Sequence, residues 1–163
     1  MAEVNVSGIR IAKSILIALG TTVSLIAGGV DFTGHWQLDP AKSKPGPERT
    51  VSLDLQQQGN NVTFVRKYQD RDGKEATARF TCSIGSSSCD FDENGHKAKV
   101  SLWYDGPQIV VLKTDGEKRE NTVEWHMKLS DDGKTLNINR EIIAPSDETE
   151  KLVFNKSESV ASR

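Results

Sequence analysis

Apolar and polar residues alternate with a period of two along most of the chain after residue 30, and no segment there keeps a helical period over ten residues. Successive side chains of a β-strand point to opposite faces, so this alternation predicts strands that bury one face. In the segment 50–57, for example, Val51, Leu53 and Leu55 fall on one face and the residues between them are polar. The same pattern predicts strands near 32–38, 62–68, 75–83, 97–105, 108–114, 122–130, 135–143 and 150–156.

Short turn signals separate these segments. Gly59-Asn60, the run Asp70 to Gly73 and Asp132-Gly133 have the residue types that favour tight hairpins. About eight short strands joined in this way predict an all-β fold, an antiparallel up-and-down meander. Because closing the meander into a barrel removes its exposed edges, we expect a closed barrel, with an open sandwich as the alternative.

The first 29 residues have a different composition. Arg10 and Lys13 precede an uncharged apolar run, and the small residues Ala27 and Gly29 follow it. This is the layout of a secretory signal peptide in residues 1–29, an N-terminal hydrophobic helix that is cleaved on export to the periplasm or the medium. The alternative is a retained membrane anchor in 14–30, which barely reaches a spanning length. We therefore expect one exported domain in 30–156 and a frayed tail in 157–163.

Charge and cysteine content narrow the possibilities further. The net charge of −2 and the absence of a basic stripe argue against nucleic acid as a partner. The chain has two cysteines, Cys82 and Cys89, both in the exported part. An even count in an oxidising compartment predicts a disulfide between them, whereas a redox or zinc motif would need a different spacing.

Two arginines fall in phase with apolar residues. Arg66 shares the face of Phe64 and Tyr68, and Arg140 shares the face of Ile138 and Ile142. A guanidinium group inside a barrel needs partners or water, because burying an unpaired charge is costly. Each arginine could bind an anionic ligand group in a hydrated cavity, or it could be structural. For Arg140 we favour the structural alternative, with stacking on Trp36.

No constellation of catalytic or metal-ligating residues emerges from the pattern. His35 and His126 alternate away from Trp36 and Trp125, and His96 lies in a turn, so the three histidines are not expected to converge on a metal. The pairs Asp70/Asp72 and Asp131/Asp132 fall in turns, where aspartate is favoured for backbone hydrogen bonds. There is no Gly-x-Ser-x-Gly elbow. We predict no catalytic residue, no metal and no cofactor.

The domain begins with FTGHWQLDPAKSK, which contains Phe32, Gly34 and Trp36, and it ends with LSDDGKTLNINREII followed by EKLVFNK. In these two segments the chain resembles small exported bacterial proteins with a lipocalin-like β-barrel domain. It implies a barrel with a possible ligand cavity and no particular ligand. The Gly-x-Trp element is similar to the first strand of lipocalins, in which the tryptophan packs across the closed end beneath a late arginine. Gly34, Trp36 and Arg140 would form that barrel end here.

The leading hypothesis is an exported, non-enzymatic barrel that binds a small apolar or amphipathic molecule. Phe64, Arg66, Tyr68 and Trp125 are the candidate cavity residues, and such a cavity should hold about 300 Å³ or more. The alternatives are a cell-envelope protein-interaction domain with a filled barrel, and an enzyme on the same scaffold. A membrane is expected as a partner only through 14–30, and the oligomeric state is left open.

Overall fold

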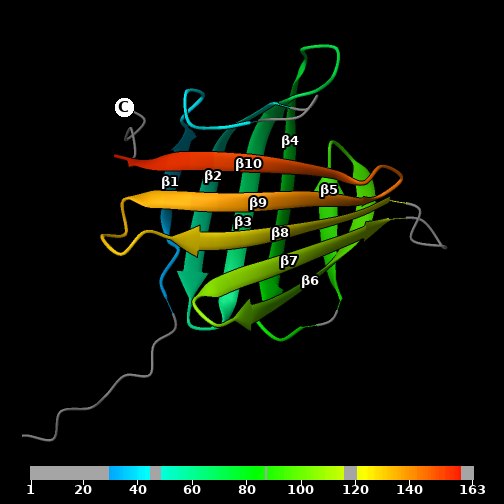
Figure 1. The fold of residues 1–163 in the computed structure, drawn as a ribbon. Helices are drawn as coiled ribbons and strands as arrows, with labels where there is room; N and C mark the ends of the chain where they lie inside the picture. The colour runs from blue at the N-terminus through cyan, green and yellow to red at the C-terminus, as the bar shows by residue number, and fades with distance from the viewer. Residues whose placement is uncertain (1–29, 45–48, 87, 116–120, 159–163) are drawn as a thin grey trace, which may run out of the picture.

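The computed structural model describes residues 30–44, 49–86, 88–115 and 121–158, so the export segment predicted in 1–29 lies outside the described residues. The described part contains ten strands and no helix (Figure 1). The strands are β1 Gly34–Leu38, β2 Arg49–Gln58, β3 Asn61–Gln69, β4 Glu75–Ser83, β5 Cys89–Glu93, β6 His96–Asp105, β7 Gln108–Asp115, β8 Asn121–Leu129, β9 Thr135–Ala144 and β10 Glu148–Ser157. Within this described part there is thus no helix that could cross a membrane.

Each strand pairs antiparallel with the next one along the chain, and the first strand also pairs with the last. Trp36 of β1 lies opposite Leu53 of β2 on one side and opposite Lys156 of β10 on the other. The hydrogen-bonded ladder therefore closes on itself, as Figure 1 shows where β10 lies beside β1. The predicted closed meander is confirmed, and the open sandwich is excluded.

The barrel has ten strands, and the expected number of about eight was too low. The strand that the pattern missed outright is β5, in which Phe91 is the single buried side chain. One apolar residue among polar ones shows no alternation. Its turn into β6 is nevertheless a clear hairpin signal, because Asn94 and Gly95 both take positive φ angles (52° and 85°), as a two-residue type I′ turn requires.

Val51 is not on the inner face, where the alternation placed it. The register between β2 and β3 shifts between Thr50 and Ser52. This β-bulge turns Val51 outward, with 37% of its surface exposed, while Thr50 and Ser52 are buried. An extra residue in one strand reverses the face of its neighbours, which alternation alone does not detect.

The Gly-x-Trp element closes one end of the barrel, hereafter the closed end. Trp36 is fully buried, and its Nε1 donates a hydrogen bond to the carbonyl oxygen of Phe32 at 3.1 Å. The ammonium group of Lys156 lies 5.2 Å from the centre of the Trp36 ring. A Cβ atom on Gly34 would come within 2.7 Å of the Lys156 side chain. A side chain at this position would therefore displace the end of the Lys156 side chain from the indole, whereas glycine leaves room for it.

Arg140 does not stack on Trp36 as predicted. Trp36 lies opposite Lys156 on β10, whereas Arg140 lies opposite Glu150 on the same strand. Six residues of β-strand separate these two positions, which corresponds to about 20 Å. Arg140 thus belongs to the opposite end of the barrel, hereafter the mouth, and Lys156 is the cation that covers Trp36.

The predicted disulfide is confirmed. Cys82, near the end of β4, is bonded to Cys89, the first residue of β5. The pair joins two strands that share only three paired positions. The bond therefore fixes the shortest ladder between consecutive strands in the described barrel.

Candidate functional site

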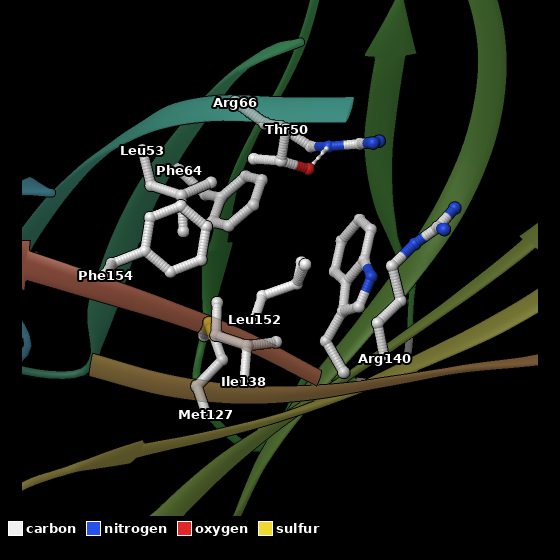
Figure 2. A pocket seen from close by; sticks show the side chains of 10 residues that line it. Thr50, Leu53, Phe64, Arg66, Met127, Ile138, Arg140, Leu152 and Phe154 are labelled. Atoms are coloured by element: carbon white, nitrogen blue, oxygen red, sulfur yellow. Dashed lines mark hydrogen bonds between the residues drawn. The ribbon is translucent and has the colours of Figure 1, made fainter. Parts of the chain in front are cut away.

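The inner surface of the barrel changes from apolar to charged toward the mouth. Arg66 and Arg140 are buried, with 2% and 6% of their surface exposed, so both point inward as the alternation predicted. In Figure 2 their guanidinium groups extend toward the same side, away from Phe154 and Leu53. The two arginines mark the beginning of a charged layer.

Arg66 is held by three neighbours. Its Nε donates to Thr50 Oγ1 at 2.9 Å, and its Nη1 lies 3.6 Å from Glu93 Oε1. Its guanidinium carbon lies 4.1 Å from the centre of the Tyr68 ring. Because the bulge at Val51 turns Thr50 inward, it supplies the hydroxyl group that Arg66 needs in the barrel.

Glu93 connects the two sides of this layer. Its carboxylate forms ion pairs with Lys113 and Arg66. Burial alone would raise the pKa of Glu93, but the charge and hydrogen bond of Lys113, together with Arg66 and Tyr68, outweigh it and hold the pKa below its ordinary value. Glu93 is therefore ionised at neutral pH, and it neutralises one of its two cationic partners.

Arg140 is paired with Glu150, the residue opposite it on β10. Arg140 Nη1 lies 3.0 Å from Glu150 Oε2, and Glu150 is 2% exposed. Neither carboxylate oxygen of Glu150 accepts a hydrogen bond of good geometry from the described residues, so its contact with Arg140 is an ion pair. The charged layer thus consists of Arg66, Arg140, Lys113, Glu93 and Glu150. Its formal charge is +1.

Below this layer the barrel is filled by aromatic side chains. The Phe64 ring stacks between Phe80 and Trp125, with ring centres 4.9 Å and 5.5 Å apart, and Phe91 contacts both of these neighbours. The cavity that is left has a volume of about 10 Å³ (Figure 2), close to the minimum for a single water molecule. It is lined by Thr50, Leu53, Phe64, Arg66, Trp125, Met127, Ile138, Arg140, Leu152 and Phe154.

The described barrel thus lacks the interior cavity of about 300 Å³ that an enclosed ligand would need. Of the four candidate residues, Phe64, Arg66 and Trp125 do line the small cavity. Tyr68 does not line it, because the Arg66 guanidinium group lies over its ring. A role for any of the four in ligand binding stays a prediction.

A larger pocket of about 260 Å³, hereafter the mouth pocket, lies on the outer side of the charged layer. Arg140 lines both this pocket and the small interior cavity. The mouth pocket is lined by Arg71, Glu93, His96, Lys113, Asp115, Asn121, Val123, Arg140, Ile142, Ala144, Pro145 and Ser146. With histidine neutral, its three basic and two acidic side chains leave a charge of +1.

The three histidines do not converge, in agreement with the sequence pattern. His35 pairs with Asp54, His96 with Asp115 at 2.6 Å, and His126 with Glu124 at 2.7 Å. Each pair lies on a different part of the barrel. Among the residues that the structure describes, no group of three or more histidine, cysteine or carboxylate side chains could hold a metal ion.

No protein-family model and no curated protein sequence matches this chain. Solved structures do match it. One is apo lipid binding protein 8 of Caenorhabditis elegans, with a TM-score of 0.58, 11% sequence identity, and coverage of 77% of this chain and 95% of that one. The likeness establishes the fold. This chain therefore shares its barrel architecture with that protein, and at such low identity no ligand and no residue role is transferred with it.

The sequence analysis missed three charged residues of the layer, Lys113, Glu150 and Glu93. Lys113 is in phase with Ile109 and Val111, and Glu150 is in phase with Leu152. The rule that singled out Arg66 and Arg140 would have found them, had it been applied to every strand. Glu93 had no such signal, because its strand shows no apolar alternation.

Proposed function

We propose that this protein is an exported, non-enzymatic binding barrel that holds a small amphipathic acid in its mouth pocket. The observation that carries the proposal is the mouth pocket of about 260 Å³, in which basic groups outnumber acidic ones beside a buried charged layer. Ligand pockets in proteins usually combine apolar walls with a few polar groups that fix the orientation of the ligand.

The charges favour an anionic group on the ligand. Arg71, Lys113 and Arg140 line the pocket, and Glu93 and Asp115 offset two of these three charges. A carboxylate or phosphate placed among them would bring the local charge to zero or below. Hydrogen bonds between ionised partners are stronger than neutral ones, so such a group would be held well.

The apolar part of the ligand would lie against Val123 and Ile142 in the same pocket. It would not reach deep into the barrel, because the interior offers about 10 Å³. A pocket near the lower end of the usual size range suits a short-chain or single-ring acid better than a long lipid. The lipid binding neighbour supports an apolar component in the ligand.

The proposed export rests on the sequence of residues 1–29 and on the disulfide between Cys82 and Cys89. Disulfides persist in oxidising compartments and are rare in reducing ones. The proposed absence of catalysis rests on the positions of the three histidines, which lie on different parts of the barrel and do not converge on one site.

A protein-interaction domain is the second candidate function. The filled aromatic interior supports it, because a barrel without room for a ligand can still present its loops and outer face to a partner. In that case the charged layer would only stabilise the mouth.

Calorimetric titration with octanoate and with its neutral analogue octanol separates the two candidates. We expect octanoate to bind and octanol to bind at least tenfold more weakly, which corresponds to about 1.4 kcal/mol. Arg71→Gln should weaken octanoate binding severalfold. The matched control Arg79→Gln removes the same charge from an exposed position on β4 and should leave binding unchanged.

Equal binding of octanol and octanoate would overturn the assignment of an acid, and equal losses in both variants would overturn the site. No binding of either compound would favour the interaction domain.

A further inference from the structure

The outer face of the barrel over β6 to β10 carries two rows of side chains that the mouth pocket does not use. Strand register sets each row, because residues opposite one another on neighbouring strands share a face. The first row runs Trp103, Val110, His126, Asn139, Lys151 and Lys44. The second row runs Asp105, Gln108, Lys128, Asn137 and Val153.

A groove of about 460 Å³ lies along these rows. It is lined by Lys42, Gln108, His126, Lys128, Asn137, Ile138, Asn139, Lys151, Leu152 and Val153. The lining contains three lysines and no carboxylate. Lys42 is paired with Asp39 at 3.2 Å, whereas Lys128 and Lys151 form no ion pair with any residue that the structure describes. Two uncompensated positive charges therefore face solvent in a concave site.

Two carboxylates beside the groove contact its polar side chains, whereas Asp105, at the end of the second row, is exposed and does not line the groove. Glu124 contacts His126 Nε2 at 2.7 Å, and Glu141 accepts a hydrogen bond from Asn139 Nδ2 at 3.0 Å. Both contacts hold groove residues in place, and both carboxylates point to side chains of the groove while keeping their negative charge. With Gln108 and Asn137, the groove presents three side-chain amides, each with a donor and an acceptor for hydroxyl groups.

An outward-facing tryptophan lies at one end of the first row. Trp103 is half-buried and lies opposite Val110, which is outward-facing yet almost completely buried and outside the main core. From Trp103 to Lys151 the row crosses four strand spacings, about 19 Å. The face of an indole packs well against the apolar CH groups of a ligand. The row therefore offers a flat aromatic surface in addition to its amide and ammonium groups.

We propose that this outer groove binds an acidic polysaccharide. The lysines would pair with carboxylate groups of the polymer, the amides would bind its hydroxyl groups, and Trp103 would pack against a sugar ring. This site shares no lining residue with the mouth pocket. The inference therefore stands independently of the small-molecule ligand proposed above.

Other macromolecular partners fit the groove less well. A peptide could not add to the sheet as a strand, because the described barrel is closed and leaves no free edge. A lipid surface would need exposed apolar side chains, but the large ones that are exposed in the described part, Val30, Val51 and Ile143, do not line the groove.

The test is calorimetric titration of the full chain with hexagalacturonate, with neutral cellohexaose as the first control ligand. We expect hexagalacturonate to bind with an affinity that falls as salt rises, and cellohexaose to bind at least tenfold more weakly. The double variant Lys128→Gln/Lys151→Gln should lose at least tenfold in affinity. The matched variant Lys97→Gln/Lys99→Gln removes two lysines that pair with Asp92 and Asp90 on another part of the surface, and it should bind normally.

Two further arms separate a glycan site from a nonspecific charge effect. Trp103→Ala should weaken binding of hexagalacturonate severalfold, whereas octanoate binding at the mouth should be unchanged. Poly-L-glutamate, an anionic polymer without sugar rings, should bind at least tenfold more weakly than hexagalacturonate. Equal binding of poly-L-glutamate would overturn the glycan in favour of an acidic protein partner. Equal losses in the two double-lysine variants, or no binding of hexagalacturonate, would overturn the site.

Discussion

Glu93 links the charged groups of the mouth. It contacts Lys113 from β7 and Arg66 from β3, so one carboxylate joins three strands that are distant in sequence. Its side chain is largely buried, and removing it would leave two cations without their shared counter-charge. Charged groups left unpaired away from water are costly.

The lowered pKa of Glu93 gives a pH-dependent prediction. A carboxylate whose folded pKa lies below its unfolded value stabilises the fold above that unfolded value and loses the contribution as pH falls through the folded pKa. We expect Glu93→Gln to reduce the free energy of unfolding by about 1–3 kcal/mol at pH 7, and the difference from the wild type to shrink below pH 4.5, the ordinary value. Urea unfolding from pH 7 to pH 3 measures it, and a difference independent of pH would contradict this role.

Trp36 is the residue on which the closed end depends. Trp36→Ala should lower the free energy of unfolding by roughly 3–5 kcal/mol, because it opens a large cavity in a tightly packed region. Trp103→Ala is the matched control, since it removes the same side chain from a half-buried outer position, and we expect a much smaller loss. Urea unfolding of both variants measures the difference. A loss below about 1 kcal/mol for Trp36→Ala would contradict its place in the core.

At the scale of the strands, alternation predicted most of the barrel from sequence because one face of each strand is buried. The same phase placed Arg66 and Arg140 inside, and both are buried. It failed at β5, where Phe91 stands alone among polar residues. It also failed at Val51, where a bulge reverses the face. Which cation covers Trp36 depends on strand register, and no local pattern contains that information.

The short β5 strand depends on its disulfide. β5 shares three paired positions with β4, and the bond between Cys82 and Cys89 anchors the start of that pairing. Closing so short a loop should stabilise the protein by about 2–3 kcal/mol in the chain-entropy model. The double variant Cys82→Ser/Cys89→Ser should therefore melt at a lower temperature. Its β5 amides should also exchange with solvent faster, whereas those of β8 and β9 should change little.

Calorimetric melting curves and hydrogen exchange of the wild type and of the double serine variant test the role of the disulfide. A variant with wild-type melting temperature and unchanged β5 protection would show that the ladder holds without the bond.

At the scale of the whole molecule, the barrel divides into two unequal parts. Aromatic rings and Trp36 fill the closed end and the middle, and a charged layer separates them from the pocket at the mouth. This chain shares its fold with a lipid binding protein. The interior cavity of its barrel nevertheless has a volume of only about 10 Å³. We therefore expect binding at the mouth pocket, which touches the charged layer and holds about 260 Å³.

The location of bound octanoate tests this account most directly. Backbone amide shifts of the isotope-labelled protein, followed by NMR during a titration with octanoate, report which residues meet the ligand. We expect shifts at the mouth, around Glu93, Lys113 and the segment 142–146, and unchanged amides around Phe32 and Trp36. Shifts centred on Phe32 and Trp36, or no shifts at saturating octanoate, would contradict it.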